Sequence, residues 1–189
     1  KCLYSNSAYA VLAMVIENIS GQPFAEFMQK EIFEPLGMMQ TSVYQKDQAI
    51  QHRAYGYSQI GRVFRMTDQS TTSAVQGDGG IYSSVIDYQK WDDALYTNQL
   101  VPMAVFEKSL IPQDDLLDYR YQQYADGWRC DYIRGIKITH HSGHTKGFTN
   151  YTLRIPALKI AVVVLSNRNN EDAVIYIGNT LAALFSDGR

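Results

Sequence analysis

Two stretches near the N-terminus show the apolar spacing of amphipathic helices. Between residues 7 and 19 apolar side chains recur every three to four positions, which predicts a helix with one apolar stripe. Ser5 or Asn6 can cap the start of this helix, and Gly21 can end it. A second helix is predicted to begin at Pro23, where the missing N–H loses no helical hydrogen bond, and to close at 35–38. The stripes comprise Ala8, Val11, Leu12, Val15, Ile16 and Ile19, and then Phe24, Phe27, Met28 and Ile32.

The last third of the chain changes from helical to strand-like sequence. Strands are predicted at 128–133, 137–141, 150–155 and 160–166. The turns between them are short, which indicates antiparallel neighbours and therefore a meander. Residues 172–185 return to helical spacing, with apolar side chains on one side that can cover the sheet.

The segment between these two regions is mostly polar and irregular. Short strands are predicted near 54–57 and 62–66, followed by a Gly77-Asp78-Gly79-Gly80 turn with wide backbone freedom. A third helix is predicted from Ser84 to about residue 96. Residues 102–118 predict a short helix and then a loop.

This order of elements is typical of an α+β fold: helices, then an antiparallel meander, then a closing helix. We expect one domain over 1–189, with a mainly helical region at 1–125 and the sheet with its closing helix at 126–189. A sheet of three or four strands with one helix is thin for this length. Its outer edges are expected to be open.

The composition is that of an ordinary globular protein and narrows the range of partners. Apolar residues make up 46% and charged residues 19%, and the net charge is −2. No attraction to nucleic acid is expected at this charge, and no apolar run reaches the roughly 18 residues that span a bilayer. Cys2 and Cys130 are expected to be free thiols, because a disulfide framework normally uses more cysteines. No signal peptide is recognisable, and because the chain opens at Lys1 without Met, we expect that its natural N-terminus has been lost.

Tyr4-Ser5-Asn6 stands directly before the first helix and is a candidate for chemistry. A tyrosine phenol near a cation loses its proton more easily and can act as a general base, and an asparagine amide can hold a substrate carbonyl. The alternative is a plain helix cap, since Ser and Asn are common caps.

A second candidate is the histidine cluster His140, His141 and His144. His140 and His141 are adjacent on a predicted strand, so they point to opposite faces, and His140 can be an ordinary packed residue. A zinc site that used His141 and His144 would need further ligands from elsewhere. We therefore expect no metal and no cofactor.

Several blocks of the sequence together resemble one family, in the order in which that family has them. They resemble the serine β-lactamase and penicillin-binding-protein superfamily, in the branch of class C β-lactamases, DD-peptidases and esterases. The blocks are Y-S-N-x-x-Y at 4–9, I-F-E-P-L-G-M at 32–38, G-G-I-Y-S-S at 79–84, Y-A-D-G-W at 124–128, H-S-G at 141–143 and V-V-V-L-S-N at 162–167.

The resemblance implies an acyl-enzyme mechanism on an amide or ester and a role for each matching residue. Tyr4 corresponds to the base and acid, and Asn6 and His141 to groups that orient the reactants. Ser142 and Gly143 belong to the third motif of the family, and the backbone N–H of His144 corresponds to one oxyanion donor. His141 stands where β-lactamases carry Lys, which favours the esterase and peptidase side of the branch. The family also suggests a bacterial extracytoplasmic location.

The nucleophile of this family is the Ser of an S-x-x-K helix, and no Ser in this sequence has a Lys three residues later. The resemblance therefore implies an incomplete β-lactamase-like fold, the C-terminal portion of a catalytic domain that is inactive alone. Such a piece is expected to self-associate or to bind a complementary N-terminal segment.

Two other interpretations stay open. One is a non-catalytic protein that binds a peptide or acyl ligand on the same scaffold, and the other is an unrelated α+β domain. If the parent protein is a serine hydrolase, its substrate can be a β-lactam, a D-amino-acid peptide or an ester.

Overall fold

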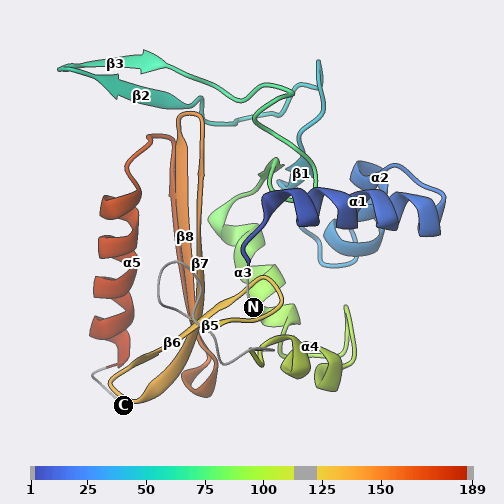
Figure 1. Cartoon of the computed structure of the whole chain (residues 1–189), viewed down its shortest axis with the longest axis vertical. Helices are drawn as coiled ribbons and strands as arrows, with labels where there is room; N and C mark the ends of the chain where they lie inside the picture. Colours follow the sequence, from blue (N-terminus) through green and yellow to red (C-terminus); the bar gives the residue numbers. More distant parts are fainter. Residues whose placement is uncertain (1–2, 113–122, 187–189) are drawn as a thin grey trace.

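A five-stranded antiparallel sheet, in the order β5-β6-β7-β8-β9, forms the centre of the computed structural model, which describes residues 3–112 and 123–186. Helix α5 (Glu171–Ser186) covers one face, and the other helices lie beyond the opposite face (Figure 1). The strands are β5 (Gln123–Tyr124), β6 (Arg129–Ile133), β7 (Ile136–Thr145), β8 (Phe148–Ile155) and β9 (Ile160–Ser166).

The helical side is built from short helices and two small antiparallel pairs of strands. β1 (Ser42–Val43) pairs with β4 (Ile81–Tyr82), and β2 (Tyr57–Ile60) forms a hairpin with β3 (Val63–Met66) that projects beyond the main sheet (Figure 1). The helices are α1 (Asn6–Ser20), α2 (Phe24–Met28) with a π-helical turn at Gln29–Phe33, α3 (Val85–Ala94) and α4 (Met103–Ser109).

The core between the sheet and α5 follows the two-residue period of β8. Tyr151, Leu153 and Ile155 are buried against α5 residues such as Val174 and Ala182. The intervening residues Asn150, Thr152 and Arg154 point to the opposite face, towards the helical side. The sheet therefore has one apolar face for α5 and one more polar face.

Two contacts tie that polar face to α3. Arg154 of β8 forms an ion pair with Asp92 of α3, and both side chains are buried. The ring of Trp91 stacks on Trp128, with centroids 5.9 Å apart and 20° between the planes. These contacts fix the helical side against the sheet on one flank of the site described below.

The α+β fold class and the antiparallel meander under a closing helix are confirmed. β7 continues to Thr145 instead of ending at His141, because Gly143 and its neighbours pair with β8 from Thr149 to Tyr151. The two strands predicted near 54–57 and 62–66 form one hairpin, slightly shifted. Cys130 is a buried free thiol; Cys2 and the end of the 102–118 prediction lie outside the described residues.

Most of the apolar stripe predicted on α1 is exposed. Of the two predicted caps it is Ser5 that caps the helix, and Gly21 ends it as predicted, in a left-handed conformation. The buried side of the helix is centred on Ala13. The opposite face is apolar and exposed, because no described element packs on it. This exposed α1 face comprises Val11, Leu12, Met14, Val15 and Ile19.

Within the described ranges, no helix is both long and apolar enough to cross a membrane.

Candidate active site

A cavity of about 1370 Å³ lies on the helical side of the sheet and collects all six residues predicted for the site. Its walls come from the start of α1, the strand β7, the irregular segment 48–54 and the β4 region. The predicted residues on its lining are Tyr4, Asn6, His141, Ser142, Gly143 and His144. Segments from opposite ends of the sequence therefore meet at one site, although the chemical role of each residue stays a prediction.

Tyr4 and His141 are in direct ring contact in this cavity. Their centroids are 6.1 Å apart with 28° between the planes, so the rings are stacked. The Nδ1 atom of His141 lies 2.7 Å from the carbonyl oxygen of Ser142. A carbonyl only accepts, so Nδ1 carries a proton, and in a neutral ring Nε2 is then the acceptor.

Tyr124 holds the other nitrogen of that ring. Its hydroxyl lies 3.0 Å from Nε2 of His141, and its ring meets Tyr4 edge-on at 5.7 Å. With Nδ1 protonated, Tyr124 donates to Nε2 and fixes the imidazole plane against Tyr4. The tautomer assignment follows from this hydrogen-bond network.

A buried cation stands beside the two phenols. The guanidinium carbon of Arg129 is 5.7 Å from the ring centre of Tyr4 and 5.4 Å from that of Tyr124, and its side chain is buried. A positive charge in a region of low dielectric stabilises negative charge developing nearby. A buried positive charge therefore lies beside both phenol rings.

The alternation of β7 separates the predicted residues into two sets. His141 and Gly143 pair with Thr152 and Asn150 on the cavity face, whereas Ser142 pairs with Tyr151 on the α5 face. The Ser142 hydroxyl donates to Glu171 of α5 at 2.8 Å. The Ser142 side chain is therefore directed away from the cavity, and any contact with a substrate comes from its backbone.

The same alternation places the His144 side chain on the face opposite to His141. Only the backbone of His144 can serve the cavity, which is the role predicted for its N–H. The two imidazoles cannot share one metal ion. Among the described residues no group of three or more His, Cys, Asp or Glu side chains is placed to hold a metal.

Two glycines allow the close packing around the cavity. A Cβ on Gly143 would lie 2.7 Å from Nδ2 of Asn150, so only glycine leaves room for the Asn150 amide to lie against the strand at this point. Gly77, with φ of 93°, packs its Cα against the Tyr9 carbonyl, and a Cβ there would lie 2.9 Å from Cβ of Ala13. This contact seats the Gly77–Gly80 turn on α1.

Tyr124, Arg129 and Glu171 were not predicted as site residues. Tyr124 belongs to the Y-A-D-G-W block, which supported only the family resemblance. Its contact with His141 depends on the pairing of β5, β6 and β7, which no local pattern encodes. Arg129 and Glu171 carry no motif of their own.

The chain belongs to the β-lactamase family, a family of serine hydrolases. The family model described as Beta-lactamase matches residues 1–185. The antiparallel sheet packed on the C-terminal helix corresponds to part of the penicillin-binding-protein and β-lactamase fold.

Three proteins of known name or structure are similar to this chain. It is 29% identical over 187 residues to penicillin-binding protein 4* of Bacillus subtilis (strain 168), covering 89% of this chain and 40% of that protein. It is similar to the octameric penicillin-binding protein homologue from Pyrococcus abyssi, with 28% identity and a TM-score of 0.81 over 98% of this chain and 43% of that one. The fold of the D-amino acid amidase from Ochrobactrum anthropi SV3, solved with L-phenylalanine amide, matches with a TM-score of 0.82 and 19% identity over 100% of this chain and 59% of that one. The chain therefore spans between 40% and 59% of the length of these proteins.

Proposed function

We propose that this chain forms the C-terminal portion of the catalytic domain of a serine hydrolase that acts on an amide or ester through an acyl-enzyme. The stacked pair of Tyr4 and His141 on the wall of a large cavity carries this proposal. In this arrangement Tyr4 is the base and acid, and Asn6 and His141 orient the reacting groups. The backbone N–H of His144 is one oxyanion donor.

In this proposal the nucleophilic serine comes from a segment outside residues 1–189. Two observations support an external nucleophile. No Ser in the sequence has a Lys three residues later. The cavity, at about 1370 Å³, also exceeds the roughly 300–1000 Å³ of ordinary ligand pockets, so it has room for a further helix as well as a substrate.

Domain organisation follows from the same proposal. Residues 1–125 supply the helical region and 126–189 the sheet with its closing helix, as two parts of one catalytic domain. The substrate is a small molecule or peptide with an amide or ester bond, and the amino acid amide bound by the related amidase has that chemistry.

The decisive experiment uses mass spectrometry after incubation with a fluorescent penicillin or an activated ester. The 189-residue chain alone is expected to form no covalent adduct, because both the nucleophile and one oxyanion donor are missing. A chain extended by its upstream coding sequence, carrying S-x-x-K, is expected to acylate stoichiometrically. In that extended chain Tyr4→Phe should slow acylation about a hundredfold or more, since general-base catalysis contributes at least that much.

Tyr132→Phe is the matched control, because Tyr132 is an exposed tyrosine of β6 that does not line the cavity. It should acylate like the parent. An adduct on any Ser of the 189-residue chain would overturn the assignment of the nucleophile. An upstream sequence without S-x-x-K, together with non-covalent ligand binding, would establish the alternative, a binding protein on the same scaffold.

A further inference from the structure

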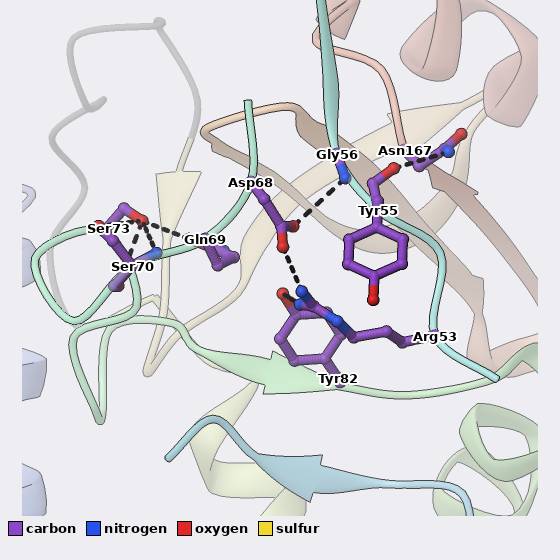
Figure 2. Close-up of polar contacts among 9 residues, drawn as sticks. All are labelled: Arg53, Tyr55, Gly56, Asp68, Gln69, Ser70, Ser73, Tyr82 and Asn167. Atoms are coloured by element: carbon purple, nitrogen blue, oxygen red, sulfur yellow. Dashed lines mark hydrogen bonds and ion pairs between the residues drawn. The ribbon is translucent and has the colours of Figure 1, made fainter. Parts of the chain in front are cut away.

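A second group of polar side chains lies on the cavity wall away from the Tyr4–His141 pair. Figure 2 shows the Arg53 guanidinium between the Asp68 carboxylate and the Tyr82 hydroxyl. Nη1 of Arg53 donates to Oη of Tyr82 at 2.8 Å, and Nη2 pairs with Oδ2 of Asp68. Arg53 and Tyr82 both line the cavity.

The direction of the Arg53–Tyr82 hydrogen bond determines whether the Tyr82 hydroxyl can donate to a ligand. A guanidinium only donates, so the Tyr82 oxygen accepts and its own O–H proton remains available to another acceptor. Within the described ranges Arg53 is the only hydrogen-bond partner of this hydroxyl. Burial raises the pKa of Tyr82 in spite of the opposing effect of Arg53, so the phenol keeps its proton at neutral pH.

The position of Arg53 is fixed by the chain that follows it. Oδ1 of Asp68 accepts the backbone N–H of Gly56 at 3.3 Å, and Nδ2 of Asn167 donates to the Tyr55 carbonyl at 2.9 Å (Figure 2). Gly56 also packs against the Phe148 ring, where a Cβ would lie 2.6 Å from Cε2. The segment 53–56 is therefore attached to the ends of β8 and β9, so Tyr82 presents its hydroxyl from a rigid support.

The charge and the surroundings of this group define the ligand atoms that fit it. The positive charge of Arg53 is balanced by Asp68, so an anionic ligand gains little net attraction here. The ring of Phe148, which also lines the cavity, meets the Tyr82 ring edge-on at 5.9 Å. An uncharged acceptor next to an apolar or aromatic group matches both features.

We propose that Tyr82, positioned by Arg53 and Asp68, donates a hydrogen bond to an uncharged carbonyl oxygen of the substrate, and that Phe148 packs on the apolar group beside that carbonyl. This subsite determines specificity for neutral amide or ester substrates. The statement that its ligand is a substrate rests on the proposed function.

The test is an NMR titration of the ¹⁵N-labelled 189-residue chain with N-acetyl-phenylalaninamide. Saturable shifts are expected at residues 81–83. Tyr82→Phe removes one hydrogen bond but keeps the ring, and should weaken binding about fivefold. Tyr44→Phe is the control, because its ring contacts Tyr82 at 6.3 Å without lining the cavity, and it should bind like the parent.

Asp68→Asn separates this role from a purely structural one. Asn keeps an acceptor for Gly56 but removes the charge that balances Arg53. Its preference for the anionic N-acetyl-phenylalanine over the amide should rise about tenfold, as a charge-assisted hydrogen bond predicts. A lack of saturable shifts at 81–83, an unchanged affinity in Tyr82→Phe, or an unchanged preference in Asp68→Asn would each overturn the subsite. Acylation of the extended chain is measured separately, so its failure would overturn the proposed function and leave this binding result intact.

Discussion

The carboxylate of Asp87 accepts the backbone N–H of Gln40 at 2.7 Å, although the two residues lie 47 positions apart in the sequence. The same oxygen accepts the Thr41 hydroxyl at 3.0 Å, and the other oxygen pairs with Nζ of Lys90 at 2.9 Å. Asp87 is buried at the start of α3. It therefore joins the loop after the π-helical turn to the β4 region, which forms one wall of the cavity.

We expect Asp87→Asn to destabilise the fold by about 2–3 kcal/mol, because buried donors lose a charged acceptor. Burial raises the pKa of Asp87, but the hydrogen bonds from Lys90, the Gln40 N–H and Thr41 together lower it by more. The pKa of Asp87 therefore lies below its ordinary value. Such a group stabilises the fold above its unfolded pKa of about 4 and loses that contribution as the pH falls through the folded value.

Denaturant melts between pH 7 and pH 3 measure this effect. The difference between the parent and Asp87→Asn should be full at pH 7 and should shrink below pH 4. Asp93→Asn, an exposed carboxylate on the same helix, is the control and should change little. A difference that grows at low pH would contradict the assignment.

The buried pair of Asp92 and Arg154 predicts a strongly non-additive response. Asp92→Asn leaves the Arg154 charge buried among the rings of Tyr96, Phe106 and Trp128, and should destabilise the fold by about 3–5 kcal/mol. The double variant Asp92→Leu/Arg154→Met removes both charges and should recover most of this loss. Chemical denaturation of the parent, the single variants and the double variant gives the coupling free energy between the two side chains. Additive changes in the free energy of unfolding would show that the charges do not interact.

Gly178 of α5 predicts an inverted effect of a helix-favouring substitution. Ala is about 1 kcal/mol better than Gly in a helix interior. At Gly178, however, a Cβ would lie 2.8 Å from Cε1 of Tyr151, whose hydroxyl is held by Asn179 at 3.0 Å. Gly178→Ala should therefore destabilise the fold by about 1–3 kcal/mol. In a Tyr151→Val background the same change should be neutral or stabilising. Thermal melts of the parent, the two single variants and the double variant measure both effects. An equal destabilisation by Gly178→Ala in both backgrounds would contradict the prediction.

The exposed α1 face predicts self-association of this chain. It is a contiguous apolar surface, and β9 adds a sheet edge that pairs with no strand among those described. The melting temperature should therefore rise with protein concentration, and light scattering should detect oligomers. Val15→Lys should weaken association, whereas Gln45→Lys, which adds the same charge at an exposed polar position, should not. A monodisperse monomer whose melting temperature is independent of concentration would contradict this prediction.

Local patterns predicted the elements whose signals are contained in a few residues. The cap at Ser5, the left-handed Gly21 and the closing helix were all placed within a residue or two. The meander was predicted from alternation and turns. The end of β7 could not be predicted locally, because Gly143 is a poor strand former and only pairing with Asn150 keeps it in the ladder.

The exposure of the α1 stripe could not be predicted from its spacing for a different reason. An apolar stripe indicates that a surface is suited to burial, and says nothing of whether the covering element is present. Tyr4, Asn6 and His141 were brought together by the family resemblance. The contacts of Tyr124 with His141 and of Arg53 with Tyr82 join residues 17 and 29 positions apart, and only the folded arrangement shows them.

The alternation of β7 makes this strand intolerant of changes in length. Removing one residue between Ile136 and His141 would shift the register so that the cavity received the side chains now anchored on α5. The imidazole would then be directed into the apolar core beside Tyr151. Insertions at the tip of the β2–β3 hairpin change no such register. A lineage of such proteins can therefore vary freely in its projecting hairpin while the spacing along β7 is inherited unchanged.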